Sequence, residues 1–256
     1  MDDFRERNGA ALIAGGTGGI GAEIVRLLAG RGSEIGFTYR ANRDAAEALT
    51  KEVVQHGRSC DSWAVDLADA EAVADVVAGF EQRFGELHTV VYAAGPHVPM
   101  VHLSNVSPQQ YRDQLNADAA AFFNLMHATL PLLRRSRGSV VAVTTAATRR
   151  FPVRDGLSTG TKGAVEAVAR ALAVEEGGYG IRVNCVGPGM LTDGMAERLI
   201  TSGDLDQTAL EVARRNIPLR RFGTATDIAE AVAFLASDRA GFISGQALDI
   251  DGGYTA

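Results

Sequence analysis

The chain is poor in cysteine: Cys60 and Cys185 lie far apart in 256 residues, and no CxxC pair occurs. It also lacks a run of 18 apolar residues, so we expect no membrane-spanning helix. The N-terminal residues MDDFRERNGA are charged where a signal peptide would be apolar. The five histidines include no HExxH pattern, and we assign no metal. These absences predict a cytoplasmic protein.

The sequence also lacks an excess of positively charged residues. The net charge of −6 argues against general nucleic-acid binding, which needs a basic face. The sequence has neither an internal repeat nor a linker rich in Pro, Gly and Ser, so we interpret residues 1–256 as a single domain. Hydrophobic residues make up 46% of the chain, which is enough for a sizeable core. The 29 glycines stand between periodic segments and do not form low-complexity runs.

Short apolar segments alternate with amphipathic segments along the chain. The pattern predicts strands at 10–14, 34–39, 59–65, 89–93, 139–144, 181–186 and 248–250. It predicts helices at 19–31, 43–57, 69–84, 107–135 and 226–236, and one that carries Lys162. Such alternation with near-continuous apolar strands is typical of a parallel sheet covered on both faces. We therefore predict an α/β fold, a single-domain doubly wound parallel sheet of the Rossmann type, with ligands at the carboxyl ends of its strands.

Three of the predicted helices begin with residues suited to capping. Asp69 precedes one helix as an N-cap candidate. Ser107 with Gln110, and Thr224 with Asp227, have the spacing of a capping box. These positions predict where the helices start.

The segment AGGTGGIG, residues 14–21, follows the first predicted strand and opens an amphipathic helix. Its glycines fit both the GxxxGxG and the GxGxxG spacing. Glycines let the backbone approach a pyrophosphate, and the helix N-terminus supplies N–H groups and a positive dipole end. The strand and helix on either side favour a dinucleotide site over a simple tight turn.

The second predicted strand ends at Tyr39 and Arg40, where an NAD site usually carries an acid for the ribose hydroxyls. No acid stands there. The guanidinium of Arg40, with Arg43 as a second candidate, can pair with a 2′-phosphate. We therefore expect NADP(H) rather than NAD(H); the alternative is that Arg40 is a solvated charge beside the helix.

Four more motifs extend this pattern. Asp66-Leu67 follows the third strand, YAAG at 92–95 follows the fourth, IRVNCVGPGMLT occupies 181–192, and IPLRRFGTATDIAEAVAFLASDRAGFISGQALDIDGG occupies 217–253. With the glycine loop, these motifs make nearly the whole chain resemble the short-chain dehydrogenase/reductase family, close to its 3-oxoacyl-[acyl-carrier-protein] reductase branch. The resemblance implies an oxidoreductase that uses a nicotinamide cofactor.

The resemblance also implies the site residues. The cofactor would be bound by Gly15, Thr17, Gly18, Gly19, Ile20, Gly21, Tyr39, Arg40, Asp66, Leu67, Ala93, Ala94, Gly95, Lys162, Pro188, Gly189, Leu191 and Thr192. The catalytic candidates are Asn116, Thr145, Ser158, Lys162 and His97. Asn116 would take the place of a helix asparagine that holds a proton-relay water in the family. Residues 190–216 would form a substrate lid.

One departure from the family stands at the centre of the predicted site. The family's YxxxK motif reads Ser158-x-x-x-Lys162 here, and its catalytic serine is replaced by Thr145. A lysine ammonium can lower the pKa of a tyrosine hydroxyl, which starts near 10, but an alkyl hydroxyl is far too weak an acid for such tuning. Ser158 and Thr145 can still donate hydrogen bonds, whereas losing a general acid typically costs a rate factor of about 10²–10⁴.

Several groups are candidates for the missing proton source. His97 follows the YAAG loop, and its side chain titrates in the right range. Asp155 lies seven residues before Lys162, where some enoyl reductases of this fold have their tyrosine. Arg149, Arg150 and Arg154 lie in the same loop and offer an alternative role, the recognition of an anionic substrate or of a carrier-protein phosphate.

Three functions remain open from the sequence. The first is an NADP(H)-dependent oxidoreductase acting on a carbonyl substrate, 3-oxoacyl or polyketide-like, with an unusual proton source. The second is a catalytically silent cofactor-binding subunit that partners an active paralogue in a hetero-oligomer. The third is a non-redox enzyme of the same fold, in which Thr145 and Lys162 assist elimination or isomerisation. A homo-oligomer, dimer or tetramer, is the expected assembly, since the helices at 117–129 and 163–173 are alanine-rich and suit close contact.

Overall fold

Parallel strands make up one seven-stranded sheet in the computed structural model, which describes residues 2–192 and 207–256. The strand order is β3-β2-β1-β4-β5-β6-β7, and every neighbouring pair is parallel. The strands are β1 (Ala10–Ala14), β2 (Glu34–Tyr39), β3 (Cys60–Ala64), β4 (Leu87–Tyr92), β5 (Ser139–Val143), β6 (Arg182–Pro188) and β7 (Ala247–Ile250). The central strands β1, β4 and β5 are buried at every position, as a sheet with two covered faces requires.

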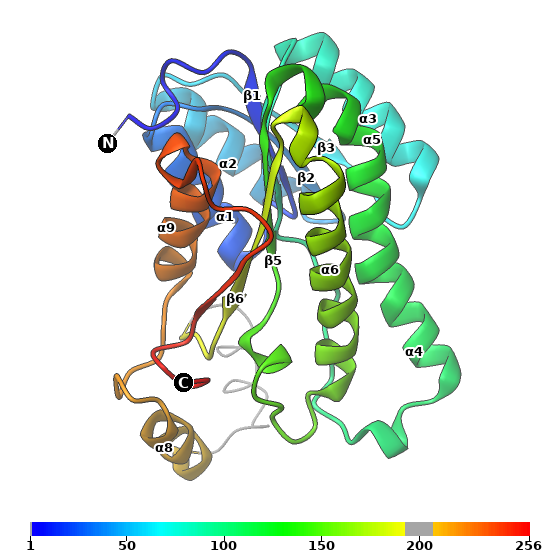
Figure 1. Ribbon diagram of the computed structural model, residues 1–256, viewed down its shortest axis with the longest axis vertical. Helices are drawn as coiled ribbons and strands as arrows, with labels where there is room; N and C mark the ends of the chain where they lie inside the picture. The colour runs from blue at the N-terminus through cyan, green and yellow to red at the C-terminus, as the bar shows by residue number, and fades with distance from the viewer. Residues whose placement is uncertain (1, 193–206) are drawn as a thin grey trace.

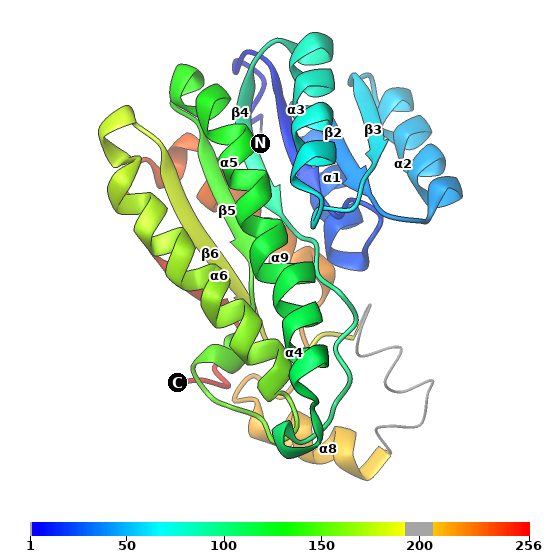
Figure 2. The ribbon, with the colours of Figure 1, turned by 90° about the vertical axis from the view of Figure 1, so that its right-hand side faces the viewer.

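Helices cover both faces of this sheet (Figures 1 and 2). One layer contains α1 (Gly19–Gly30), α2 (Arg43–Gln55) and α9 (Ala225–Ala236), whose buried side chains form one hydrophobic cluster with the sheet. The other contains α3 (Ala70–Phe84), α5 (Ala121–Ser136) and α6 (Gly156–Glu175), which form a second cluster on the opposite face. The described part of the chain also includes α4 (Pro108–Leu115) and α8 (Gln207–Asn216). The predicted doubly wound α/β fold is confirmed.

The predicted helix starts are also confirmed. Asp69 accepts hydrogen bonds from the backbone N–H groups of Glu71 and Ala72 at the start of α3. Complete capping boxes open α4, with Ser107 and Gln110, and α9, with Thr224 and Asp227. In the second box the Arg221 guanidinium lies beside Asp227 and lowers the pKa of that carboxyl to about 2. Each cap satisfies N–H groups that a helix leaves unpaired in its first turn.

The helix predicted over 107–135 is not continuous. A π-helical segment, Asn116–Ala120, separates α4 from α5. One extra residue per turn shifts the helical phase, so residues beyond the segment face different neighbours than an unbroken helix would give them. This shift decides which polar residue of the helix reaches α6.

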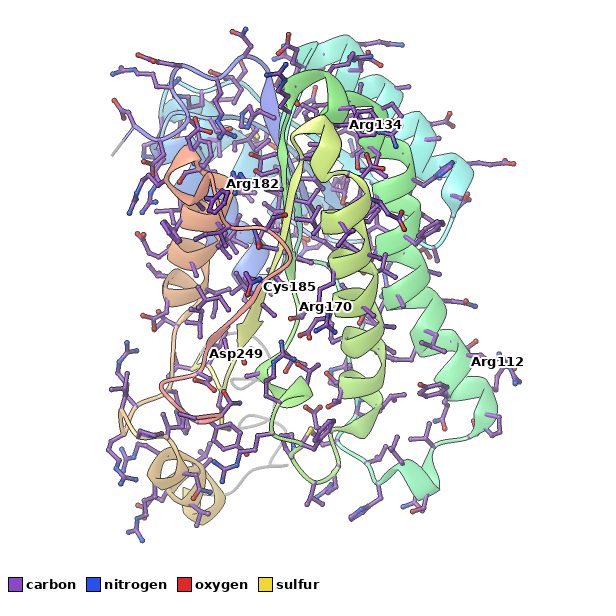
Figure 3. All side chains as sticks on the ribbon, viewed as in Figure 1. Arg112, Arg134, Arg170, Arg182, Cys185 and Asp249 are labelled. Carbon is purple, nitrogen blue, oxygen red and sulfur yellow. The ribbon has the colours of Figure 1, made fainter. Side chains whose placement is uncertain are left out.

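Arg182 is the first residue of β6 and is labelled in Figure 3. Its guanidinium donates to the carbonyl oxygens of Leu235, Ala236 and Ser237, at 2.6, 3.1 and 3.0 Å. These are carbonyls that the end of α9 leaves without helical partners. Arg182 therefore ties the last helix to the sheet at the end opposite the site.

The sheet order reverses between β1 and β4, which lie side by side with β2 beyond β1 and β5 beyond β4. In doubly wound folds a ligand crevice opens at the carboxyl ends of the strands at such a switch point. The loop after β1 and the loop after β4 meet there: a Cβ on Gly15 would lie only 2.8 Å from the Cα of Ala94. The site is built around this crevice. No helix in residues 2–192 and 207–256 is long and apolar enough to cross a membrane.

Candidate active site

The segment from β1 into α1 leaves no room for a side chain at Gly15, Gly16 or Gly21. Gly15 has φ +86°, a conformation that favours glycine, and the N–H groups of Gly15 and Gly16 both donate to the Thr38 carbonyl at 3.1 and 2.8 Å. A Cβ on Gly16 would lie 2.5 Å from the Phe37 ring, and one on Gly21 would lie 2.1 Å from the Gly15 carbonyl oxygen. The loop is therefore held close against β2 and against the first turn of α1.

The N-terminus of α1 is open to a ligand. Gly18 is its N-cap and supplies no side-chain cap, and Gly18 and Gly19 are exposed while Thr17 and Ile20 are half-buried. The first N–H groups of the helix and its positive dipole end are thus exposed without a competing side-chain cap. A backbone cradle of this kind fits a pyrophosphate, so the residues present fit a dinucleotide.

Arg40 and Arg43, both candidates for a 2′-phosphate, have different surroundings at the end of β2. Arg43 donates from Nε to Glu47 at 2.9 Å, whereas the exposed Arg40 forms no ion pair within the described residues. Tyr39 beside it is half-buried. Arg40 is therefore the guanidinium that is available to a phosphate.

On the neighbouring side of the crevice, the Asp66 carboxylate accepts from the backbone N–H of Ala68 at 3.0 Å and shapes its own turn. Leu67 is buried, and its carbonyl accepts from the Asn124 side chain at 3.0 Å. These contacts give the Asp66-Leu67 pair a fixed place after β3.

The segment that ends β6 is held by backbone contacts. The Gly189 N–H donates to the Ile250 carbonyl at 3.0 Å, and a Cβ at Gly189 would lie 2.7 Å from the Cα of Asp251. Leu191 is buried and forms a bridge with Gly223, and the Thr192 N–H and hydroxyl both donate to the Gly223 carbonyl. The predicted contact residues from Pro188 to Thr192 therefore lie on a braced segment, while 193–206 of the predicted lid lie outside the described residues.

Lys162 lies in a buried polar network. Its Nζ donates to Asp118 Oδ1 at 2.8 Å and to the Ala94 carbonyl at 3.2 Å, and it lies 5.2 Å from the centre of the Tyr92 ring. The Asp118 side chain is 1% exposed, and the Lys162 side chain is 13% exposed. The Tyr92 hydroxyl donates to Asp118 Oδ1 at 3.1 Å and to its carbonyl at 2.9 Å, and Thr161 donates to Oδ2 at 2.9 Å. Asp118 is thus the centre of the network.

This arrangement corrects the expectation for Asn116. Asn116 is exposed, and it makes no contact with Lys162. Asp118, two residues later in the π-helical segment, is the residue that pairs with Lys162, whereas Asn116 was our candidate for the residue that holds a relay water. The sequence carried one signal for it, because a carboxylate at helical spacing from the apolar Phe122 and Leu125 lies on a buried face. Tyr92 was not predicted as a site residue either.

The hydroxyls expected to contact the substrate have few partners. Thr145 Oγ1 accepts from the Ala147 N–H at 3.2 Å, which leaves its proton free to be donated elsewhere. Ser158 is half-buried, and its hydroxyl makes no hydrogen bond to any described residue. His97 is exposed and likewise has no described side-chain partner. The structure therefore places Ser158 and Lys162 one turn apart on α6 and leaves His97 at the surface.

Asp155 precedes α6 and differs from an ordinary N-cap. Its side chain makes no cap hydrogen bond, although the residue stands at the N-cap position with φ −105° and ψ 13°. Burial raises the pKa of its carboxyl to about 6. Asp155, Ser158 and Lys162 have the spacing i, i+3 and i+7, which is one face of a helix. A carboxyl that is partly protonated near neutral pH therefore stands at the start of the helix that carries Ser158 and Lys162.

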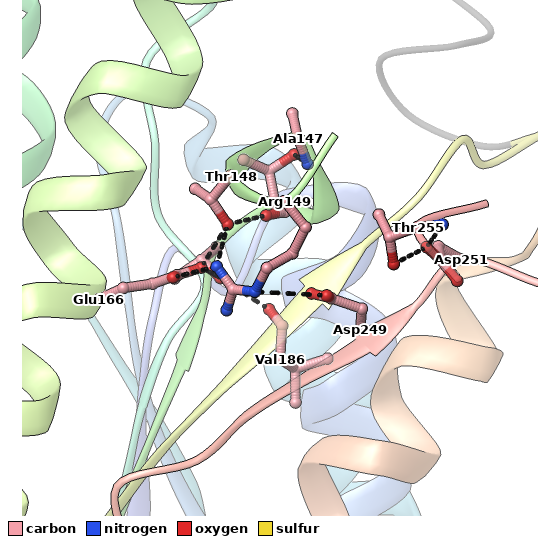
Figure 4. A network of polar contacts seen from close by, with 10 residues as sticks. Ala147, Thr148, Arg149, Glu166, Val186, Asp249, Asp251 and Thr255 are labelled. Carbon is pink, nitrogen blue, oxygen red and sulfur yellow. Dashed lines mark hydrogen bonds and ion pairs between the residues drawn. The ribbon is translucent and has the colours of Figure 1, made fainter. Parts of the chain in front are cut away.

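The arginines of the loop before α6 are engaged within the protein. Figure 4 shows the Arg149 guanidinium between Glu166 and Asp249, at 2.8 and 3.7 Å. Glu166, 2% exposed, also accepts from Thr144 and Thr148. Two further contacts fix the rest of the loop: Arg150 donates to the Tyr254 carbonyl, and Arg154 to that of Met100. These guanidinium groups brace the loop, which argues against their role as an anion-recognition surface.

Two other kinds of site, a reactive cysteine and a metal site, can be assessed from the side chains. Cys60 and Cys185 are free and buried, and Cys185 is labelled in Figure 3. Burial raises the pKa of each thiol to about 12, so neither is a thiolate at neutral pH. Within residues 2–192 and 207–256, no group of three or more His, Cys, Asp and Glu is arranged to hold a metal ion. The candidate catalytic groups among the described residues are therefore hydroxyls, a lysine and carboxyls.

Comparisons with known proteins agree with this geometry. The family model described as enoyl-(acyl carrier protein) reductase matches residues 14–255. The chain is 31% identical to the 3-oxoacyl-[acyl-carrier-protein] reductase FabG of Staphylococcus epidermidis, over 96% of this chain and 98% of that protein. It is 32% identical to versicolorin reductase stcU of Emericella nidulans, over 98% of this chain and 97% of that protein.

Solved structures are also similar to this chain over nearly its full length. A short-chain dehydrogenase/reductase from Serratia marcescens superposes with a TM-score of 0.89 at 28% identity, covering 98% of this chain and 100% of its own. A blue fluorescent protein from a metagenomic library, solved in complex with NADPH, superposes with a TM-score of 0.88 at 28% identity, covering 99% and 100%.

Proposed function

Because this chain belongs to the short-chain dehydrogenase/reductase family, we propose that it is an NADP(H)-dependent oxidoreductase whose active site works without the family's tyrosine. Its substrate would be a carbonyl compound, 3-oxoacyl or polyketide-like. The observation that carries the proposal is the glycine cradle at the switch point: Gly15 and Gly21 are packed so closely that no side chain fits, and α1 opens onto the crevice.

The cofactor residues follow from the positions described above. The N–H groups at the start of α1 would hold the pyrophosphate, and Arg40 the 2′-phosphate. Asp66 and Leu67 would contact the adenine, Ala93 to Gly95 the ribose side of the crevice, and the braced segment from Pro188 to Thr192 the carboxamide. NADPH, when bound, supplies a hydride to the carbonyl carbon. Support for NADP(H) comes from Arg40 and from the NADPH complex of the metagenomic relative.

The remaining residues would act on the carbonyl oxygen. The Thr145 and Ser158 hydroxyls donate hydrogen bonds that stabilise the negative charge developing there. Lys162 holds the nicotinamide ribose, a role that does not depend on a tyrosine. Asp155 is our candidate for the proton donor, because it stands at the start of the helix that carries Ser158 and Lys162 and its pKa of about 6 keeps part of it protonated near neutral pH. After the transfer, Asp155 regains its proton from solvent.

The substrate class rests on the relatives. One is a 3-oxoacyl-[acyl-carrier-protein] reductase and another a versicolorin reductase, and both cover nearly the full chain at 31% and 32% identity. Both names describe reductases, and the polyketide-like part of the proposal follows from the second. We keep the single domain 1–256, the lid at 190–216 and a cytoplasmic location as parts of this proposal; the reduced state of the two cysteines accords with the last.

The first experiment is a titration of the purified chain with NADPH and with NADH, followed by intrinsic fluorescence. Tight binding of NADPH alone is expected, and absence of binding by either would refute the proposal. NADPH oxidation is then measured against 3-oxoacyl thioesters and simple ketones. The activity of the unmodified chain should fall as the pH rises through about 6, and Asp155→Asn should abolish this pH dependence together with most of the rate. His97→Ala is the matched control and should retain both.

A second candidate function is supported by the same site. Lys162 is already paired with Asp118, and large apolar side chains are exposed on the helices and near the C-terminus, among them Phe123, Val174 and Phe242. A cofactor-binding subunit that assembles with a second copy, or with an active paralogue, would have these features. Binding of NADPH without turnover on any tested carbonyl, together with a dimer or tetramer by light scattering, would favour this function over the first.

A further inference from the structure

We propose that Asp118 compensates the charge of Lys162. The two form an internal ion pair, so this lysine does not acidify a hydroxyl at position 158, and the serine at that position goes together with the aspartate. The inference rests on the proposed function only in treating position 158 as the place of the family's catalytic tyrosine. The ion pair itself is a property of the folded chain and does not depend on that function. Three observations carry it, and each concerns a different member of the network.

The first observation is the ion pair. Lys162 Nζ and Asp118 Oδ1 are 2.8 Å apart, and the carboxylate is almost fully buried. At this distance, opposite charges largely cancel for any group farther away, and burial prevents water from separating them. A hydroxyl one turn before Lys162 therefore faces a near-neutral pair, where a lone ammonium would lower its pKa.

The second observation is that the carboxylate is held from every side. Its Oδ1 accepts from both Lys162 and Tyr92, and its Oδ2 accepts from Thr161. Three donors fix the carboxylate in place and satisfy both of its oxygens. Asp118 therefore stays paired with Lys162 in the folded chain.

The third observation concerns Tyr92, which contacts both members of the pair. Burial and the Asp118 carboxylate raise the pKa of Tyr92 well above its ordinary value. Its hydroxyl already donates to Asp118, and its side chain is fully buried. Tyr92 thus supports the carboxylate and cannot replace the tyrosine missing from position 158. Asp118 is a positioning residue that acts through Lys162.

The consequence is that restoring the tyrosine alone does not restore the family's chemistry. The Ser158→Tyr variant keeps the Asp118 carboxylate, so the new phenol should titrate near or above its ordinary pKa of about 10. Adding Asp118→Asn removes the compensating charge and leaves the lysine ammonium uncompensated beside the phenol. The pKa of the introduced phenol should then fall by roughly 1–3 units.

The experiment measures tyrosinate absorbance against pH in four proteins: the unmodified chain, Ser158→Tyr, Asp118→Asn and the double variant. Subtracting the matched parent without the new phenol removes the signal of the chain's own five tyrosines. Asp113→Asn, an exposed carboxylate one turn earlier on α4, serves as the control and should leave the titration of the Ser158→Tyr variant unchanged. NADPH oxidation is followed in parallel, and the double variant should exceed Ser158→Tyr at least tenfold at neutral pH.

A depressed phenol pKa in Ser158→Tyr alone, by more than one unit, would overturn the proposal, and this measurement does not require Asp118→Asn to fold. Equal pKa values in the single and double variants would overturn it as well. Failure of the proposed function is read separately, from the NADPH titration of the unmodified chain. If that chain bound no NADPH, the pKa measurements would still decide the role of Asp118.

Discussion

Gly21 and Gly30 both lie in α1, yet adding one methyl group to each should have opposite effects. The Cβ of Gly21→Ala would lie 2.1 Å from the Gly15 carbonyl oxygen and 2.9 Å from its carbonyl carbon. These atoms belong to the backbone, so no side chain can rotate away and the phosphate loop itself has to move by about 1 Å or more. A Cβ on Gly30 would meet no atom within 4 Å.

The expected magnitudes follow from this difference. Overpacking typically costs 1–3 kcal/mol, and a backbone clash lies at the upper end, so Gly21→Ala should lose about 3 kcal/mol of unfolding free energy. For a chain of this size that is a fall in Tm of roughly 6–12 °C. Gly30→Ala should gain about 0.5–1 kcal/mol, because alanine has less freedom than glycine in the unfolded chain and suits a helix.

Two assays test the pair of variants: calorimetry for Tm and a fluorescence titration for NADPH. We expect Gly21→Ala to weaken NADPH binding at least tenfold, since the loop that would carry the N–H groups is displaced. Gly30→Ala should bind as the unmodified chain does. Wild-type affinity in Gly21→Ala would refute the reasoning, because it would mean that the close approach of loop and helix is not needed for the cofactor.

Three further predictions concern single side chains. Arg40→Asp should raise the Kd for NADPH about 10–100-fold, because a charge-assisted contact is worth roughly 1.5–3 kcal/mol, and it should leave NADH binding little changed. Arg43→Asp should have a smaller effect in the same titration, because Arg43 is paired with Glu47. Asp118→Ala should lower the unfolding free energy by about 3–5 kcal/mol in urea melts, because the buried Lys162 loses its partner, and an effect below 1 kcal/mol would contradict the buried pair. Burial lowers the pKa of His88 from 6.5 to about 3, so the folded state binds fewer protons than the unfolded state. The stability that neutral His88 confers is therefore complete above about pH 6.5, and up to roughly 5 kcal/mol of unfolding free energy is lost as the pH falls toward 3. His88→Gln should flatten this part of the stability profile, measured by urea melts at a series of pH values.

Much of the site could be predicted because its signals are local. The glycine loop, the absence of an acid at the end of β2 and the capping boxes each depend on residues a few positions apart. Strand and helix periodicity then predicted the sheet, because burial on both faces leaves a near-continuous apolar pattern in each strand. The Ser158-x-x-x-Lys162 spacing, on which the predicted departure from the family's YxxxK motif rests, was visible without any coordinates.

The residue beside Lys162 could not be predicted in the same way. The family resemblance directed attention to Asn116, whereas the π-helical segment changes the helical phase and brings Asp118 to the lysine. Tyr92 joins the network from β4, far away in the chain. Contacts between distant segments depend on the packing of whole elements, and a single sequence contains no direct record of that packing.

The loop before α6 shows the same limit. Its arginines suggested a site for an anionic ligand, but Arg149 is paired with Glu166 from α6 and faces Asp249 from β7. The sequence by itself determined the fold class and the positions of the glycine loop and of the Ser158-x-x-x-Lys162 spacing, because each is set by local pattern and residue type. Only the tertiary structure decided which charges neutralise one another, because the strength of an ion pair depends on distance and burial, and both exist only after the chain has folded.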